Sequence, residues 1–562
     1  MNGINYKLYG FISGVFFFVL IIVAPVPKTM LYIGSKTVLS HADNHVLQNI
    51  GIKKASDITK ENFIIFSKKS KNVLVKVPKN FSKTGYKGIK LSKGKGKRLS
   101  DLFYIQANAI KMTIAIAVLM AIFWITEAIP IPITSLLPLL LFPVLNISNL
   151  KYISFPGFFN PAHLYMHYLI ILFLAGFTIA EAMKKWNLHR RISLFFLSKT
   201  DFTPYKIIFS FMLITAFLSM FISNTATTAM MLPIGLGIIA TATNNAGKSN
   251  FGKVLMLGIA YSASIGGVGT LIGTPPNVVL AGFADTLLGV KITFGNWLLI
   301  GLPITIIMLP VTFMILIKLF PIEKVDVTGG RNRIKSELGK MGKFSRGEKN
   351  TLIIFIIVAL IWIFEKNIKD LFHLPWVNDA VVGVFAILLF YIIPVDFKKW
   401  EFTLDWNSNK KLPWGTLLLF GGGLALGTGL DKTGAASYIA QSLTSFNSVS
   451  FLIVLLSTVF LMVFLTEITS NTASTNMMLP ILFSIGLTTA HNPLVLMTAG
   501  AIGASMAFML PVATPPNALV FGSGYIKIKD MMKAGIFLNF ISILLITILL
   551  YFYKFYIPVF SK

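Results

Sequence analysis

Two stretches of the chain repeat each other and decide how it is organised. Residues 223–234 read SNTATTAMMLPI and residues 470–481 read SNTASTNMMLPI, so ten of twelve positions are identical. Further along, Thr274-Pro275-Pro276-Asn277 recurs as Thr514-Pro515-Pro516-Asn517. The two pairs are separated by 247 and 240 residues, so the same motifs recur in the same order at nearly the same offset. The chain is therefore predicted to consist of two homologous halves.

The composition places most of the chain in lipid. Of 562 residues, 55% are hydrophobic and only 13% are charged, which excludes a soluble globular enzyme, a disordered chain and a fibrous repeat. The formal charge is +29, but the basic residues crowd the gaps between apolar stretches. This distribution favours loops and lipid headgroups over nucleic acid. The absence of cysteine excludes disulfides, thiolate metal sites and cysteine nucleophiles.

The apolar segments predict an all-α polytopic membrane protein, with about eleven transmembrane helices and two re-entrant hairpins. A segment with 16 Lys and Arg against 4 Asp and Glu between residues 34 and 101 predicts a soluble insert. The expected organisation is an N-terminal transmembrane helix (1–33), a soluble basic insert (34–106), repeat 1 (107–320, with a hairpin at 205–241 and a broken helix at 253–284), a basic cytoplasmic linker (321–349) and repeat 2 (350–557, with a hairpin at 449–489 and a broken helix at 495–522).

Basic loops predict the orientation of the two halves. With the N-terminus in the cytoplasm, the basic loops 185–205, 319–349 and 396–412 lie inside, and most outer loops hold few Lys or Arg; the long insert is the exception. Each half then contains five crossings, an odd number, so the two halves are inverted relative to each other. Inverted repeats with broken helices are typical of secondary transporters.

The repeated polar motifs predict an anion site and cation sites within the membrane. Ser, Asn and Thr are preferred helix N-caps, so a new helix is expected to begin after each Ser-Asn-Thr triplet. In Thr-Pro-Pro the threonine caps a helix and proline occupies its first turn, where the missing N–H has no consequence. Four half-helix N-termini would then offer backbone N–H groups to an anion without a buried Arg or Lys. The half-helix C-termini, with exposed carbonyls, suit Na⁺.

Two other features of apolar segments allow more than one interpretation. Glu467 lies three residues before the second triplet. An intramembrane carboxylate is a functional candidate, and this one could ligate Na⁺, tune the second cation site or pair with a scaffold residue. Gly421-Gly422-Gly423 lacks the Lys-Ser/Thr of a phosphate loop and sits in an apolar segment, which favours close helix packing.

The paired Ser-Asn-Thr and Thr-Pro-Pro-Asn motifs, together with FWITEAIPIP at 123–132, resemble the divalent anion/sodium symporter family. That family transports di- and tricarboxylates and sulfate. The resemblance covers about residues 105–557 and leaves out the insert. It implies that the triplets lie at the tips of two re-entrant hairpins, that the transporter is a homodimer, and that the hairpins and broken helices slide through the membrane in an elevator mechanism.

The resemblance also implies site residues, carried over by position. The first Na⁺ site would be Ser219, Ser223, Asn224 and Gly273. The second would be Thr466, Thr469, Asn471 and Ala513. The substrate would be held by Asn224, Thr225, Thr274, Asn471, Thr472 and Thr514.

The sequence therefore predicts a carrier, not an enzyme, that couples Na⁺ entry to uptake of a C4 dicarboxylate such as succinate, malate or fumarate. Citrate and sulfate remain alternative substrates, and a Na⁺-independent dicarboxylate exchanger of the same fold is the nearest alternative function. An oxyanion efflux pump subunit is a more distant alternative, because no Asp or Glu occurs within the triplets. The expected location is a bacterial inner membrane.

Overall fold

A computed structural model of the chain describes residues 3–40, 44–50, 99–145, 147, 161–242, 249–442, 449–489 and 491–556, together with short stretches between 52 and 98. Its contacts divide the chain into two compact units. Unit 1 comprises Met1–His167, Leu418–Val449 and Asn476–Pro493, and unit 2 comprises Tyr168–Leu417, Ser450–Thr475 and Leu494–Lys562. The units do not coincide with the two sequence repeats. Both triplets and both Thr-Pro-Pro motifs belong to unit 2.

Unit 1 contains the N-terminal helices, a small sheet and two later helical segments. In the sheet, β1 lies between β2 and β3 and pairs antiparallel with both. Its elements are α1 (Gly3–Val23), α2 (Lys28–Leu39), α3 (Asn44–Asn49), β1 (Leu74–Lys76), β2 (Lys90–Leu91), β3 (Lys97–Arg98), α5 (Leu99–Thr126), α6 (Ile131–Thr134), α7 (Leu137–Val144), α8 (Pro161–Leu164), most of α20 (Trp414–Thr433), α21 (Ala435–Ser442) and most of α23 (Asn471–Thr488).

Unit 2 is larger and almost entirely helical. Its only described sheet is the antiparallel pair β4 and β5. Its elements are α9 (Tyr168–Lys185), α10 (Leu188–Lys199), α11 (Pro204–Ser219), α12 (Asn224–Ala242), α13 (Asn250–Val268), α14 (Pro275–Leu288), α15 (Phe294–Leu319), α16 (Thr328–Lys340), α17 (Arg346–Ile363), α18 (Glu365–Leu371), α19 (Asp379–Ile392), β4 (Pro394–Asp396), β5 (Glu401–Phe402), η2 (Trp406–Lys411), α22 (Phe451–Thr466), α24 (Pro493–Gly503), α25 (Pro515–Phe521) and α26 (Ile528–Tyr556).

The N-terminal region differs from the expectation of one helix followed by a soluble insert. The chain forms two helices, α1 and α2, separated at residues 24–27. Pro25 and Pro27 lie in this break, where proline removes backbone donors and disfavours a continuous helix. Helix α5 begins at Leu99, eight residues before the expected start of repeat 1, and packs against α1 and α2. Most of the remaining insert lies outside the described residues.

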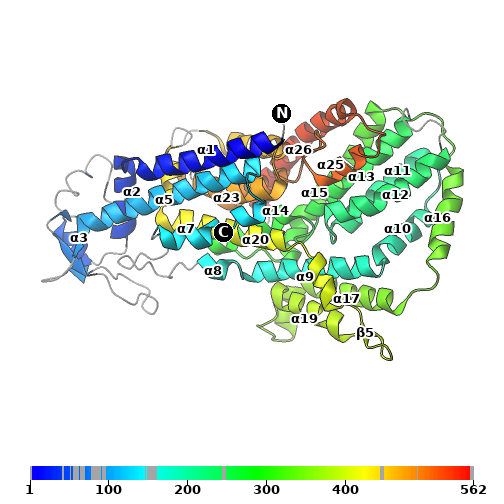
Figure 1. The fold of residues 1–562 in the computed structure, drawn as a ribbon, viewed down its shortest axis with the longest axis horizontal. Coiled ribbons are helices and arrows are strands. Elements are labelled where there is room, and N and C mark those ends of the chain that lie inside the picture. Colours follow the sequence, from blue (N-terminus) through cyan, green and yellow to red (C-terminus); the bar gives the residue numbers. More distant parts are fainter. Residues whose placement is uncertain are drawn as a thin grey trace. The chain divides into compact units, whose positions relative to one another are not determined.

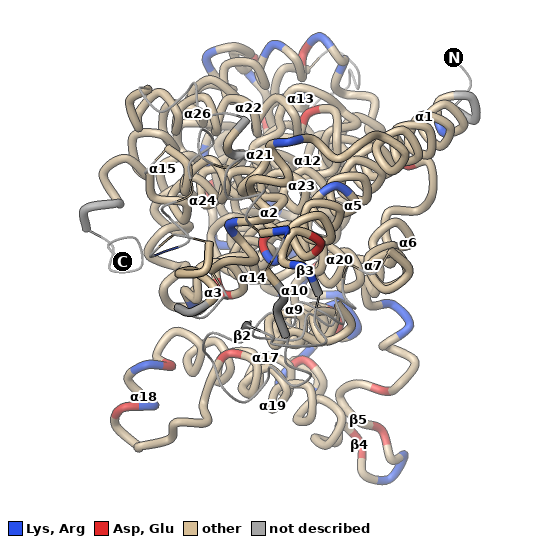
Figure 2. Tube along the Cα trace, turned by 90° about the vertical axis from the view of Figure 1, so that its left-hand side faces the viewer, with Lys and Arg blue, Asp and Glu red and all other residues tan. Residues whose placement is uncertain are grey.

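Among the described residues, seven helices are long and apolar enough to cross a membrane, or eight if the bent pair α17 and α18 forms one span. Helices α11, α19, α22 and α24 are apolar but shorter. The expected number of eleven crossings therefore stays a prediction. Large apolar side chains lie exposed along α15 and α26, including Leu299, Ile306, Phe537 and Leu544, as expected for helices that face lipid. In Figure 2 most of the helical trace is uncharged, and Lys, Arg, Asp and Glu gather at helix ends and connections.

The three consecutive glycines of α20 permit close packing within unit 1. A side chain at Gly421 would overlap the Tyr165 ring, one at Gly422 would overlap Ser135, and one at Gly423 would overlap the Asn476 amide. These contacts confirm the interpretation of the glycine run as a packing feature.

The helices that carry the repeated motifs pack closely within unit 2. Helices α11 and α12 contact each other and both contact α13, and the three lie side by side in Figure 1. Helix α25, from the second repeat, packs against α12 and α13, from the first. The two repeats therefore pack against each other through helices that carry or adjoin the motifs.

Candidate functional site

The first Ser-Asn-Thr triplet lies where one helix ends and the next begins. Helix α11 ends at Ser219 and α12 begins at Asn224, with a four-residue connection between them. The Ser223 hydroxyl accepts a hydrogen bond from the Ala226 backbone N–H at 3.3 Å. Ser223 therefore caps α12, as the preference of serine for this position predicts.

Two oxygen atoms converge on the Ser219 hydroxyl in the first repeat. The Ser219 Oγ atom lies 2.7 Å from Asn224 Oδ1 and 2.7 Å from the Ala263 carbonyl oxygen. A serine hydroxyl has one proton, so it cannot satisfy both acceptors fully. Ser219 is buried, so water does not readily replace the missing donor. A hard cation that takes oxygen ligands suits such a cluster.

The second repeat builds the same cluster from different residues. The Thr466 Oγ1 atom lies 2.7 Å from Asn471 Oδ1 and 2.8 Å from the Ala504 carbonyl oxygen. Thr466 is also buried and again supplies one proton for two acceptors. The two Asn side chains that sequence analysis assigned to both cation and substrate thus occupy equivalent positions.

The two Thr-Pro-Pro-Asn motifs have nearly the same backbone conformation, but only the Thr514 hydroxyl accepts a capping hydrogen bond, from the Asn517 backbone N–H at 3.3 Å. Thr274 and Thr514 are the N-cap residues of α14 and α25, with φ and ψ of −140° and 144° in the first and −141° and 147° in the second. The Asn277 amide donates to the Thr270 carbonyl at 2.8 Å, and the Asn517 amide donates to the Leu510 carbonyl at 3.1 Å. Each asparagine therefore bridges the break in its own helix, a role that the sequence analysis did not assign.

Two glycines of α13 let the first hairpin approach the broken helix. A side chain at Gly266 would overlap the Ala216 backbone of α11, and one at Gly267 would come within 2.5 Å of Asn224 Oδ1. Sequence analysis did not single out these residues. The available signal was their position just before the Thr-Pro-Pro motif, in a run of small residues.

The remaining predicted cation ligands make contacts of their own near the helix ends. Gly273 is packed so tightly that an added Cβ would be 2.5 Å from the Gly267 carbonyl oxygen. The Thr469 hydroxyl donates to the Leu465 carbonyl at 2.8 Å and contacts the Ser474 hydroxyl. Ala513 donates its backbone N–H to the Leu510 carbonyl at 3.2 Å. Two residues that the sequence analysis did not name, Ala263 and Ala504, contribute carbonyl oxygens to the clusters.

Two of the motifs open into one cavity. A cavity of about 520 Å³ is lined by Thr225, at the first triplet, and Pro515, at the second Thr-Pro-Pro motif. The rest of its wall consists of Leu232, Leu236, Ala518, Leu519, Gly522 and Ser523. Thr274, Thr472 and Thr514 are buried and do not line it. The cavity therefore reaches two of the motifs that the substrate site was expected to combine.

Glu467 is neither exposed nor aimed at open space. Its carboxylate accepts hydrogen bonds from the backbone N–H groups of Phe508 at 2.8 Å, Met509 at 2.9 Å and Leu510 at 3.1 Å. It also accepts one from the Asn539 amide at 2.8 Å. Glu467 therefore stabilises the break between α24 and α25, and its oxygens already have four donors.

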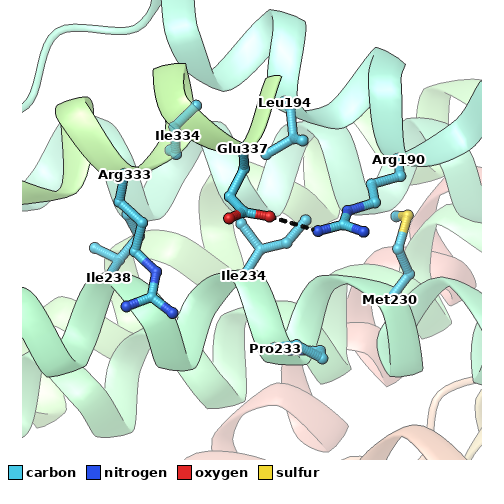
Figure 3. A pocket seen from close by; sticks show the side chains of 9 residues that line it. All are labelled: Arg190, Leu194, Met230, Pro233, Ile234, Ile238, Arg333, Ile334 and Glu337. Atoms are coloured by element: carbon cyan, nitrogen blue, oxygen red, sulfur yellow. Dashed lines mark hydrogen bonds and ion pairs between the residues drawn. The ribbon is translucent and has the colours of Figure 1, made fainter. Parts of the chain in front are cut away.

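A second cavity lies beside the linker helix α16. It has a volume of about 360 Å³. Figure 3 shows the Arg190 guanidinium paired with Glu337 across it, at 2.7 Å, while Arg333 extends along α12. Its wall consists of Arg190, Leu194, Met230, Pro233, Ile234, Ile238, Arg333, Ile334 and Glu337. This cavity contains none of the predicted site residues, and it joins α10, α12 and α16.

Comparison with known proteins places the chain in a family. Residues 105–560 match the family model of the sodium:sulfate symporter transmembrane region. The sodium-dependent dicarboxylate transporter SdcS of Staphylococcus saprophyticus is 40% identical over 449 residues, covering 78% of this chain and 85% of the relative. SdcS of Staphylococcus aureus strain USA300 is 41% identical over the same shares.

Among solved structures, the chain is similar to the YdaH transporter of Alcanivorax borkumensis, with 12% identity, a TM-score of 0.46, and coverage of 71% of this chain and 88% of that one. It is also similar to MtrF of Neisseria gonorrhoeae, with 12% identity, a TM-score of 0.48, and coverage of 78% and 94%.

Proposed function

Because the chain belongs to the sodium:sulfate symporter family, the divalent anion/sodium symporters, we propose that it couples Na⁺ entry to the uptake of a dicarboxylate. The relatives that match most of its length are named as sodium-dependent dicarboxylate transporters. The chain is a multi-pass integral protein of the plasma membrane. The substrate class we propose is the C4 dicarboxylates, succinate, malate and fumarate.

The observation that carries the proposal is the pair of oxygen clusters at Ser219 and Thr466. Each has one hydroxyl proton between two acceptors, at distances of 2.7–2.8 Å. A cation that entered either cluster would replace these shared hydrogen bonds with oxygen–metal contacts. Because Na⁺ takes oxygen ligands, two equivalent clusters support at least two Na⁺ sites.

The substrate site that we propose lies beside these clusters. Asn224 and Asn471 belong to the cation clusters and begin helices α12 and α23, so one amide can serve both ligands. Helix N-termini favour negative charge, and the hydroxyls of Thr225, Thr274, Thr472 and Thr514 would add hydrogen bonds to carboxylate oxygens. Binding of Na⁺ would then complete the site for the anion, which couples the two.

The transport cycle that we propose follows from the charges. Two Na⁺ balance one dianion, and each further Na⁺ lets the membrane potential contribute about 2.3 kcal/mol per 100 mV. Inverted repeats, an elevator movement of the hairpins and broken helices, and a homodimer are part of the same proposal. The interlocking of α25 with α12 and α13 supports movement of both repeats together.

Uptake of [¹⁴C]succinate into proteoliposomes tests the proposal. The liposomes carry an inward Na⁺ gradient, with choline in place of Na⁺ as the control, and succinate, citrate and sulfate compete for uptake. We expect uptake that needs Na⁺ and is inhibited most by C4 dicarboxylates. Uptake that ignores Na⁺ but requires internal dicarboxylate would replace symport with exchange. Stronger competition by citrate or sulfate would identify that anion, and not a C4 dicarboxylate, as the preferred substrate. No uptake of labelled succinate, citrate or sulfate would contradict the proposal.

A further inference from the structure

The two oxygen clusters lie beside helix breaks that are stabilised differently. In the first repeat, α13 remains helical to Val268, and side chains donate to its last carbonyls. The Trp297 indole donates to the Val268 carbonyl at 2.8 Å, and the Thr305 hydroxyl donates to the Ile265 carbonyl at 3.0 Å. These groups satisfy the carbonyls that a helix end leaves without partners.

In the second repeat the helix ends earlier. Helix α24 ends at Gly503, so the chain from Ala504 to Ala513 has to satisfy its own backbone groups outside a helix. Glu467 accepts three successive N–H groups of this segment, as described above. At the 247-residue offset between the triplets, the residue of the first repeat that corresponds to Glu467 is Met220, which offers no charge.

The backbone of Phe508 is hydrogen-bonded through both its N–H and its carbonyl. Its N–H donates to Glu467, and its carbonyl accepts a hydrogen bond from the Tyr261 hydroxyl at 2.8 Å. Tyr261 belongs to α13 of the first repeat, and its ring packs edge-on against the Phe508 ring with the centroids 5.2 Å apart. All these groups are buried. The unwound segment therefore has one fixed path, with its Ala504 carbonyl 2.8 Å from Thr466.

We infer that Glu467 is a positioning residue for the second cation site, acting through the segment Ala504–Ala513. This inference rests on the proposed Na⁺-coupled function. Its carboxylate accepts four donors, and three of them are successive backbone N–H groups of this segment. It follows Thr466 directly in the chain, and the segment that it holds supplies the Ala504 carbonyl to the Thr466 cluster. In the first repeat, Met220 occupies the corresponding position and has no carboxylate to accept backbone N–H groups.

The chain offers a matched control for replacing the Glu467 carboxylate. Glu323 is also a carboxylate that accepts backbone N–H groups, from Asn250 at 3.1 Å and Phe251 at 3.3 Å, but at the start of α13. Glu467→Gln and Glu323→Gln therefore make the same chemical change in the same kind of contact. Only Glu467 lies beside a cation cluster.

The experiment measures the Na⁺ dependence of purified full-length protein in two ways. The first is the Na⁺ midpoint of succinate uptake in proteoliposomes, with the succinate KM at saturating Na⁺. The second is the Na⁺ concentration that half-maximally raises the melting temperature in detergent, since a bound ligand stabilises the folded state by mass action. We expect Glu467→Gln to raise both Na⁺ midpoints at least fivefold with the KM within twofold of wild type, and Glu323→Gln to leave both midpoints within twofold.

The outcomes separate the inference from the function on which it rests. A wild-type protein with neither Na⁺-dependent uptake nor Na⁺-dependent stabilisation would overturn the proposed function. A Na⁺-dependent wild type with an unchanged, folded Glu467→Gln variant would overturn only the role of Glu467. If Glu467→Gln does not fold, Asn539→Leu is the second variant, because it keeps the Glu467 carboxylate and removes one of its hydrogen-bond donors. A two- to threefold higher Na⁺ midpoint in that variant supports the role, and an unchanged midpoint overturns it.

Discussion

The two helix breaks of unit 2 share their motifs but not their means of stabilisation. In both, asparagine of Thr-Pro-Pro-Asn bridges the break, and an aromatic side chain donates to the carbonyl of an equivalent residue, Trp297 to Val268 and Tyr261 to Phe508. The first break leaves carbonyls to be satisfied and uses neutral donors. The second also has backbone N–H groups to satisfy, and a buried carboxylate accepts them.

For the two proposed cation sites, this difference indicates that equivalent oxygen clusters can have different surroundings. The Ser219 and Thr466 clusters have nearly equal distances, yet only one lies beside an intramembrane carboxylate. That carboxylate holds the backbone of the segment that supplies the Ala504 carbonyl, and Met220 at the corresponding position of the first repeat carries no carboxylate. The two sites are therefore expected to differ in Na⁺ affinity although their first ligands match.

The largest effect is expected where the first repeat has no room to change. Gly266→Ala would press a Cβ into the backbone of α11 at Ala216. Overpacking of a buried contact destabilises by typically ~1–3 kcal/mol, and here backbone atoms must move. We expect a melting temperature in detergent several degrees lower and loss of Na⁺-dependent stabilisation.

The control is Gly339→Ala in α16, where an added Cβ meets nothing within 4 Å. Since alanine favours helix over glycine, this variant should be at least as stable as wild type. At the 240-residue offset, Met506 replaces Gly266 in the second repeat and is fully buried. A Gly266→Ala variant with normal stability would contradict the prediction. It would mean that α11 and α13 can move apart enough to accept a larger residue, as Met506 is accepted at the corresponding position of the second repeat.

A smaller effect is expected from removing one ligand oxygen from each cluster. Ser219→Ala and Thr466→Val each remove the hydroxyl that two acceptors share. We expect each variant to raise the Na⁺ midpoint of succinate uptake about tenfold, which corresponds to about 1.4 kcal/mol. The Hill coefficient for Na⁺ should fall towards one if one site is lost. Wild-type Na⁺ dependence in both variants would refute the assignment of the clusters as cation sites.

The smallest effect is expected at the Arg190–Glu337 pair, far from the motifs in sequence. The hydrogen bond from Lys340 and its charge, with the charge of Arg190, lower the pKa of Glu337. Because the folded pKa lies below the unfolded one, this stabilisation is present at neutral pH and is lost as the pH falls through the folded pKa. The Arg190 side chain is 44% exposed, so screening keeps the contribution at or below ~0.5 kcal/mol.

Unfolding midpoints of wild type and Glu337→Gln, measured against pH and salt, test this expectation. The difference between them should be small at neutral pH, should shrink with added salt, and should vanish in acid. A large difference that persists in high salt would instead indicate that α16 is an essential anchor of α10 and α12.

Some contacts within the proposed site join residues at a fixed spacing in the sequence. Ser219 and Thr466 each precede an asparagine by five residues, and both pairs are in contact in the structure. By contrast, the acceptors Ala263 and Ala504 contribute only backbone carbonyls, which any residue carries. Gly266 matters through the distance between two helices, and Glu467 has partners up to 72 residues away. No local pattern encodes such contacts.

The sequence by itself determined that this is a membrane protein of two related halves with four polar motifs. Hydrophobic run lengths and a ten-in-twelve repeat are properties of the chain alone. Only the tertiary structure decided that Pro25 and Pro27 separate two N-terminal helices, that α24 ends at Gly503, and that Glu467 stabilises the segment beyond it. The physical reason is that the backbone groups at a helix end need hydrogen-bond partners outside the helix. Those partners come from distant parts of the chain, so the tertiary structure decides where a helix can end.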